Sequence, residues 1–145
     1  MPMKTISTEI LINTSKEKVW NILSDFPAYP DWNPFITEIS GELKNGSRLN
    51  VVLKIDEKKE SKFNPELISV IPGEKFCWRG KLVMKGVFDG THYFILEETE
   101  DGKTLLTHGE NFQGFLAGFI LKRIKSETLA AFERMNLAMK EKAEK

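Results

Sequence analysis

The sequence predicts an α+β fold in which an antiparallel sheet packs against one long C-terminal helix. Residues 115–142 contain no proline and carry an apolar stripe at helical spacing, whereas the segments before them alternate as short strands do. A helix on the order of 40 Å long has to bury such a stripe, and a curved sheet is the only available partner. The predicted stripe consists of Leu116, Ile120, Ile124, Ala131, Met135, Ala138 and Met139.

Length and charge limit the classes of function. With 145 residues, the chain is expected to form one domain over residues 1–145. The 21 basic side chains balance 21 acidic ones, which argues against a protein that grips nucleic acid or an acidic membrane. We therefore predict no nucleic-acid partner, and we expect a monomer or a homodimer.

Cysteine content and hydropathy point to a cytoplasmic protein. Cys77 is the single cysteine, so no internal disulfide can form, and a reduced setting is favoured. No run approaches the roughly 20 consecutive apolar residues of a membrane span. No integral membrane segment is therefore expected.

The first quarter of the chain predicts one strand followed by short helical segments. Alternating apolar residues over 5–12 indicate the strand. Thr14 with Glu17 three residues later fits a capping box, and a helix is expected from there to about Ser24. The segment Phe26–Pro34 holds three prolines and three aromatic residues, which indicates a turn or a single helical turn that covers an end of the core.

Six further strands are expected before the long helix. They cover residues 35–41, 49–55, 63–67, 76–82, 88–96 and 104–112, with turns at 44–47 and 71–74. Within the third of these segments, Pro65 cannot donate a backbone hydrogen bond, so it indicates an edge or a bulge.

The last hairpin brings the polar residues of interest together. A three-residue loop over 100–102, with Gly102 left-handed, keeps the apolar sets of both arms on one face. In that register Phe94 lies opposite His108, and His92 lies opposite Glu110. Directly opposed side chains are about 5 Å apart at Cβ, close enough to interact.

Several short motifs, together with this order of elements, resemble a known superfamily. Residues 19–23 read VWNIL, 29–35 YPDWNPF, 72–74 PGE, 76–80 FCWRG and 107–114 THGENFQG. They resemble the polyketide cyclase/dehydrase branch of the START-like, or SRPBCC, superfamily with its helix-grip fold. The resemblance implies a seven-stranded curved antiparallel sheet around the helix, in the order β-α-α-β-β-β-β-β-β-α, with an apolar cavity between them. The glycine-rich loop of the plant-type members is absent at 41–46, so no phosphate or nucleotide role is expected.

The inward face of the sheet predicts a mostly aromatic binding site with a few polar groups. Two histidines and one carboxylate, His92, His108 and Glu110, are assigned to this face. Burying them without partners costs roughly 1–3 kcal/mol for each hydrogen-bonding group. The predicted ligand-binding residues are Trp32, Phe35, Leu53, Phe63, Trp78, Leu82, Phe88, His92, Phe94, His108, Glu110, Phe112 and Phe119. Arg79 and Lys81 are expected on the outer face.

These polar residues allow three interpretations. Glu110 and His92 can form a satisfied buried pair, they can orient a polar group of an apolar ligand, or Glu110 with His92 or His108 can act as base and acid. Two histidines and a carboxylate could also bind a metal, but strand geometry disfavours three ligands within about 2 Å of one point. No metal and no cofactor are predicted.

Three functions follow. The leading hypothesis is binding of a small hydrophobic, aromatic or lipid molecule between the sheet and the C-terminal helix. The alternative is a cyclase or dehydratase that uses Glu110 and a histidine. A third is a chaperone-cofactor-like module that binds partners through its outer sheet surface, which requires an exposed apolar patch.

Overall fold

The computed structural model describes residues 4–58, 60–81, 89–114 and 117–145. Its strands are β1 (Lys4–Ile12), β2 (Ile36–Ser40), β3 (Asn50–Lys54), β4 (Glu60–Phe63), β5 (Glu66–Ile71), β6 (Lys75–Lys81), β7 (Asp89–Glu98) and β8 (Thr104–Gln113). Its helices are α1 (Lys16–Leu23), the 3₁₀ turn η1 (Phe26–Ala28), α2 (Tyr29–Trp32) and α3 (Ala117–Ala143). The predicted α+β class, with a single long C-terminal helix, is confirmed.

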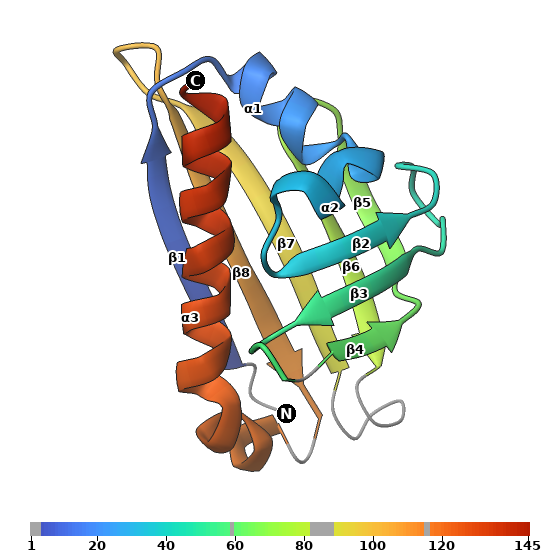
Figure 1. The fold of residues 1–145 in the computed structure, drawn as a ribbon. Helices are drawn as coiled ribbons and strands as arrows, with labels where there is room; N and C mark the ends of the chain where they lie inside the picture. Colours follow the sequence, from blue (N-terminus) through green and yellow to red (C-terminus); the bar gives the residue numbers. More distant parts are fainter. Residues whose placement is uncertain (1–3, 59, 82–88, 115–116) are drawn as a thin grey trace.

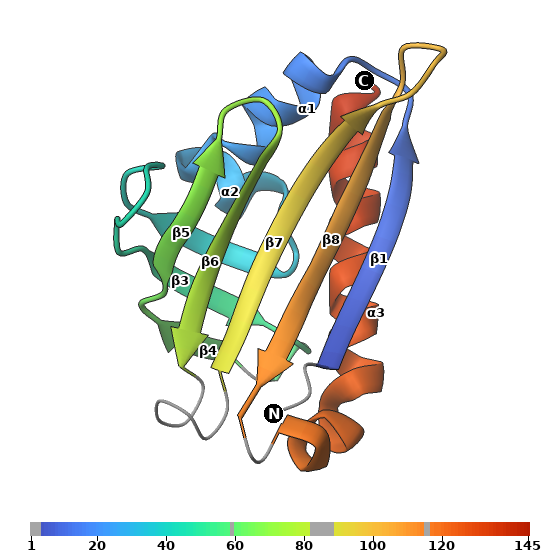
Figure 2. The ribbon, with the colours of Figure 1, turned by 180° about the vertical axis from the view of Figure 1, so that it is seen from behind.

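The strands form two antiparallel sheets that enclose one side of α3. The larger has the order β1-β8-β7-β6-β5, and the smaller has the order β2-β3-β4. Figure 1 shows β2, β3 and β4 crossing in front of the larger sheet, while α3 runs alongside β1 and β8. From behind, the larger sheet forms a continuous curved back wall (Figure 2). The space between these three layers is where a ligand site is expected.

Pro65 explains why the described residues form eight strands where the resemblance implies seven. The segment predicted as one strand over 63–67 belongs to two strands, β4 and β5, which pair with β3 and β6 respectively. Proline lacks the N–H that would continue a ladder, so the chain leaves one sheet there and enters the other. The predicted edge is thus the boundary between the two sheets.

The predicted register of the last hairpin is confirmed. In the β7–β8 ladder His92 pairs with Glu110, and Phe94 pairs with His108. Gly102 in the connecting loop has a φ of +78°, the left-handed conformation that a glycine adopts without strain. Loop geometry therefore sets the pairing on which the polar site depends.

The short helices close one end of the core. The cap of α1 differs from the prediction, because Ser15 rather than Thr14 accepts the hydrogen bond from the backbone of Lys18. In the proline-rich segment that follows, Tyr29 is fully buried, and its hydroxyl donates to the backbone carbonyl of Leu23. A buried hydroxyl needs such a partner, so this bond fixes how η1 and α2 fold back over the sheet.

Helix α3 buries a wider stripe than the sequence pattern indicates. Ala131, Met135 and Met139 are buried as predicted, while Ile120, Ile124 and Ala138 are half-buried, and Leu116 lies outside the described residues. A second buried row includes Leu121 and Phe132 and also two polar side chains, Thr128 and Asn136. Among the described residues, no helix is long and apolar enough to cross a membrane.

Truncation of the buried stripe should destabilise the fold. Met135 is 1% exposed, whereas Leu137 on the same helix is 61% exposed. We expect Met135→Ala to lower the free energy of unfolding by about 2–5 kcal/mol, because it leaves a cavity between α3 and the sheet. The matched variant Leu137→Ala should stay within about 0.5 kcal/mol of the wild type. Urea denaturation measures both values, and equal losses would contradict the assigned face.

Candidate functional site

A pocket of about 620 Å³ lies between the two sheets and α3. We call it the inner pocket. Strands β7 and β8 supply His92, Glu110 and Phe112. The remaining lining residues come from the smaller sheet and the residues next to its strands, from the end of β6 and from helix α3; they are Phe35, Leu53, Ile55, Ser61, Lys62, Phe63, Lys81, Ile120, Ile124, Glu127, Thr128 and Phe132.

The structure places only some of the predicted ligand-binding residues in the inner pocket. Six of them line the inner pocket: Phe35, Leu53, Phe63, His92, Glu110 and Phe112. Four lie elsewhere in the packed interior or at its end, namely Trp32, Trp78, Phe94 and His108. Leu82 and Phe88 fall outside the described residues.

Phe119, a predicted ligand-binding residue, does not line the inner pocket. Its side chain is 61% exposed, and the guanidinium of Arg123 lies 5.0 Å from the centre of its ring. Helical geometry places residue 119 about 100° away from residue 120, so only Ile120 of this pair faces the pocket.

The residues that sequence reasoning missed lie mainly on α3 and β4. Ile124, Thr128 and Phe132 continue the four-residue spacing from Ile120, and this row was the available signal. Lys81 was predicted on the outer face by strand alternation, yet it also lines the pocket. It is the last residue of β6, where alternation no longer constrains a long side chain. Ser61, Lys62 and Glu127 gave no sequence signal.

An aromatic layer beneath the pocket holds His92 in place. Trp78 is 1% exposed and stacks on the His92 ring, with centroids 5.0 Å apart and an interplanar angle of 20°. Phe35 stacks on the same imidazole from another side at 6.0 Å. Trp78 therefore packs in the core and fixes the orientation of His92. Trp32 similarly contacts Tyr29 at the end of the core.

Five side chains form a continuous hydrogen-bonded series, which we call the polar chain. Glu110 Oε1 lies 3.3 Å from His92 Nδ1, and His92 Nε2 lies 2.8 Å from His108 Nε2. His108 Nδ1 is 2.9 Å from Asn136 Oδ1 on α3. Asn136 Nδ2 donates to Thr8 Oγ1 on β1 over 2.8 Å. The chain runs from the pocket wall to the far side of the core, and no sequence pattern predicted Thr8 or Asn136 in it.

Burial keeps His108 neutral. Its ring is completely buried and packs between Phe94 and Phe132, with centroid separations of 4.5 and 4.3 Å. Desolvation, followed by proximity to His92, lowers the pKa of His108 well below its ordinary value of 6.5. Hydrogen bonds to the Asn136 side chain and the Phe132 backbone act in the opposite direction and do not overcome this.

The exposed end of the polar chain is Glu110. Its side chain is 15% exposed and lines the pocket, while His92 is 2% exposed. Gly90 on the neighbouring strand makes room for this carboxylate, because a Cβ at position 90 would lie 2.2 Å from Glu110 Oε2. The absence of a side chain at residue 90 therefore allows Glu110 to lie against β7 and reach His92.

The geometry of the two imidazoles is that of a hydrogen bond. Two nitrogens that bind one metal at 2.0–2.1 Å in tetrahedral geometry are about 3.3 Å apart, whereas the two Nε2 atoms are separated by 2.8 Å. Within the described residues, no group of three His, Cys, Asp or Glu side chains is arranged to hold a metal ion.

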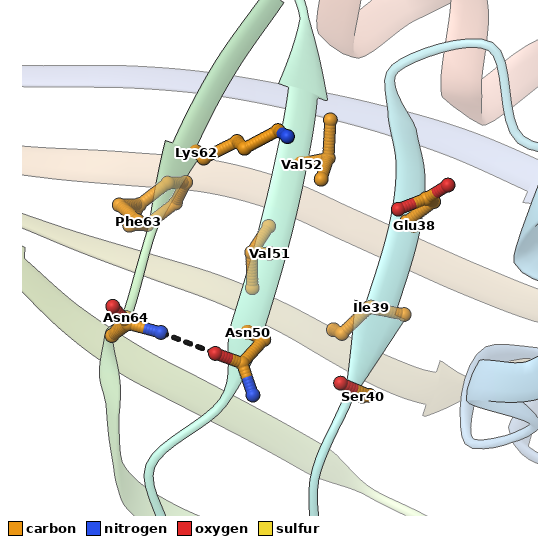
Figure 3. Close-up of a pocket in the computed structure, with 9 residues that line it drawn as sticks. All are labelled: Glu38, Ile39, Ser40, Asn50, Val51, Val52, Lys62, Phe63 and Asn64. Atoms are coloured by element: carbon orange, nitrogen blue, oxygen red, sulfur yellow. Dashed lines mark hydrogen bonds between the residues drawn. The ribbon is translucent and has the colours of Figure 1, made fainter.

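A second hollow of about 410 Å³ lies along the smaller sheet. Figure 3 shows its lining side chains on β2, β3 and β4, with Asn64 donating to Asn50. It contains neither histidine nor Glu110, so we base the site on the inner pocket.

The comparisons with known proteins place the chain in a family. A family model described as polyketide cyclase / dehydrase and lipid transport matches residues 3–144. The chain belongs to this family. The resemblance noted from the sequence motifs is thereby confirmed, and no curated protein matches the sequence.

Several solved structures share the fold. The aromatase/cyclase ZhuI from a Streptomyces species has a TM-score of 0.73 at 15% identity, covering 99% of this chain and 94% of that one. A START superfamily protein from Mycobacterium smegmatis has a TM-score of 0.71 at 21% identity, covering 97% of both chains. A hypothetical protein from Helicobacter pylori has a TM-score of 0.77 at 15% identity, covering 97% and 88%. At these identities the likeness establishes the fold alone.

The lowered pKa of His108 should make stability depend on pH. The unfolded chain binds a proton near the ordinary value of 6.5, and the folded chain does not until a much lower pH. The free energy of unfolding should therefore fall as pH drops below about 6.5, by up to about 1.4 kcal/mol per pH unit for this one group. Denaturation from pH 7 to pH 5 measures this slope.

His108→Phe isolates this contribution, because a phenylalanine ring suits the aromatic neighbours and cannot titrate. Its stability should be less sensitive to pH than that of the wild type over the same interval. Parallel curves for the two proteins would show that His108 does not control the dependence.

Proposed function

We propose that this protein binds a small hydrophobic or aromatic molecule in the inner pocket, with Glu110 as its polar contact. The observation that carries the proposal is a pocket of about 620 Å³ with aromatic and aliphatic walls and a carboxylate held by a buried histidine. Ligand pockets typically measure 300–1,000 Å³ and combine apolar walls with a few fixed polar groups.

The charged residues around the pocket favour a ligand with one polar end. Lys62, Lys81 and Glu127 belong to the lining, and all three are exposed. The apolar contacts, by contrast, come from Phe35, Phe112 and other members of the lining. An amphipathic guest with its ring system among the apolar side chains matches this distribution. The family description, which names polyketide cyclases and lipid transport, is consistent with such a guest.

Filling the pocket should weaken binding. We expect anilinonaphthalene sulfonate to fluoresce on binding to the wild type and to be displaced by flavonoids, fatty acids or polyketide-like aromatics. Ile124→Trp places a larger side chain in the pocket wall and should reduce dye affinity at least tenfold. Leu137→Trp, on the exposed face of the same helix, is the matched control and should bind as the wild type does. If the wild type and Leu137→Trp bind none of these compounds, the proposal is wrong.

A second candidate function is a cyclase or dehydratase reaction that begins with removal of a proton next to a carbonyl. The contact between Glu110 and His92 favours it, because a carboxylate backed by an imidazole can accept a proton and later return it. Glu110 would be the base that touches the substrate. His92 and His108 would stabilise it from behind.

This candidate predicts base-dependent exchange in a simple ketone. The wild type should accelerate deuterium incorporation next to the carbonyl of β-tetralone, measured by proton NMR. Glu110→Gln keeps the shape of the side chain but not its basicity, so the accelerated exchange should disappear. Glu133→Gln, on the exposed side of α3, should keep the wild-type rate. Equal rates for the wild type and Glu110→Gln would remove Glu110 from the role of base.

A further inference from the structure

We propose that the Glu110–His92 pair retains one proton between Oε1 and Nδ1, because the hydrogen bonds behind it run in a single direction. We further propose that the pocket consequently selects aromatic molecules with a hydroxyl group, which Glu110 Oε2 accepts. The second part rests on the proposed function. The first part concerns the protein without a ligand.

The donor-to-acceptor direction of these hydrogen bonds is set at Thr8. Its Oγ1 lies 2.7 Å from the backbone carbonyl oxygen of His108, a separation that two oxygens tolerate only with a hydrogen between them. A carbonyl cannot donate, so the hydroxyl proton of Thr8 points at this oxygen. Thr8 must then accept from Asn136, which places Nδ2 of the amide toward Thr8 and Oδ1 toward His108.

The tautomer of His108 follows from the orientation of the amide. Asn136 Oδ1 can only accept, so His108 Nδ1 carries a proton. A buried, neutral His108 with its proton on Nδ1 has a lone pair on Nε2.

The lone pair on His108 Nε2 determines which nitrogen of His92 carries a proton. Only one hydrogen fits between the two Nε2 atoms, and His108 cannot supply it, so His92 Nε2 donates. In a neutral His92 the other nitrogen, Nδ1, would then present a lone pair to Glu110 Oε1 at 3.3 Å. Two lone pairs repel, and one proton, located on either atom, converts this contact into a hydrogen bond.

The second oxygen of Glu110 is the one available to a ligand. Oε1 is engaged with His92, whereas Oε2 lies over Gly90 on the inward face. Among the described residues, the other charged groups that line the pocket with this carboxylate are Lys62 from β4, Lys81 from β6 and Glu127 from α3, and His108 lies behind His92. With the retained proton at Oε1, Oε2 is an acceptor, so a phenol or enol hydroxyl satisfies it and an ether does not.

Nitrogen NMR of the two histidines tests the retained proton directly. Since the chain contains only two imidazoles, ¹⁵N-histidine labelling gives four ring signals, and His108→Phe assigns them. At pH 7 we expect His108 to be protonated on Nδ1 and bare on Nε2, and His92 to be protonated on both nitrogens or shared with Glu110 on Nδ1. The reverse pattern, with His108 bare on Nδ1 and His92 bare on Nε2, would overturn the proposal.

Replacement of the carboxylate provides a second test in the same spectra. In Glu110→Gln the amide can donate to His92 Nδ1, so the retained proton is no longer needed. His92 Nδ1 should change to the signal of a bare nitrogen, and His92 Nε2 should stay protonated. Glu133→Gln should leave all four signals at their wild-type positions. An unchanged His92 Nδ1 in Glu110→Gln would contradict the shared proton.

Two probes of similar shape test the class of ligand. We expect β-naphthol to bind the wild type at least tenfold more tightly than its methyl ether, measured by calorimetry, and this preference should disappear in Glu110→Met, which has no oxygen at this position. Equal affinities in the wild type would overturn the selection for a hydroxyl. If neither β-naphthol, nor its methyl ether, nor the dye binds, the proposed function is wrong, and the ligand class with it. The histidine spectra would still show whether the Glu110–His92 pair retains a proton.

Discussion

The contact between His108 on β8 and Asn136 on α3 is the constraint on which the rest of the structure depends. Both side chains are polar and buried, at 0% and 3% exposure, and a buried group of this kind is costly unless it is hydrogen-bonded. Only one placement of the long helix against the sheet satisfies them together with Thr8 on β1. Apolar packing alone would tolerate small shifts of α3. The polar chain specifies its position.

The same constraint divides the inward face of the larger sheet into two regions. Around His108, the rings of Phe94 and Phe132 fill the space, with centroid separations of 4.5 and 4.3 Å. Beyond His92 the layers separate, and the inner pocket begins with Glu110 in its wall. The packed region fixes the orientation of His92. The open region contains Glu110, which contacts His92. Membership of a family of cyclases and lipid-transport proteins agrees with this division of labour.

Periodicity and turn chemistry predicted much of the fold, but the site only in part. The β7–β8 register followed from the glycine at 102, and it brought His92 and Glu110 together as expected. Strand alternation could not show which inward residues face a cavity and which are packed, so Trp78 and Phe94 were assigned to the pocket. Asn136 and Thr8 were missed, because their partners lie 28 and 100 residues away along the chain and are brought close only by the fold.

Because the two sheets separate at Pro65, the two walls of the inner pocket belong to different sheets. One wall, with Leu53 and Phe63, belongs to the smaller sheet, and the opposite wall, with His92 and Glu110, belongs to the larger one. The β3–β4 ladder ends before Pro65 and shares no strand with the β7–β8 ladder. The size of the first wall can therefore change without altering the strand pairing that places Glu110 beside His92. Evolution can change the volume of the pocket without changing the position of Glu110.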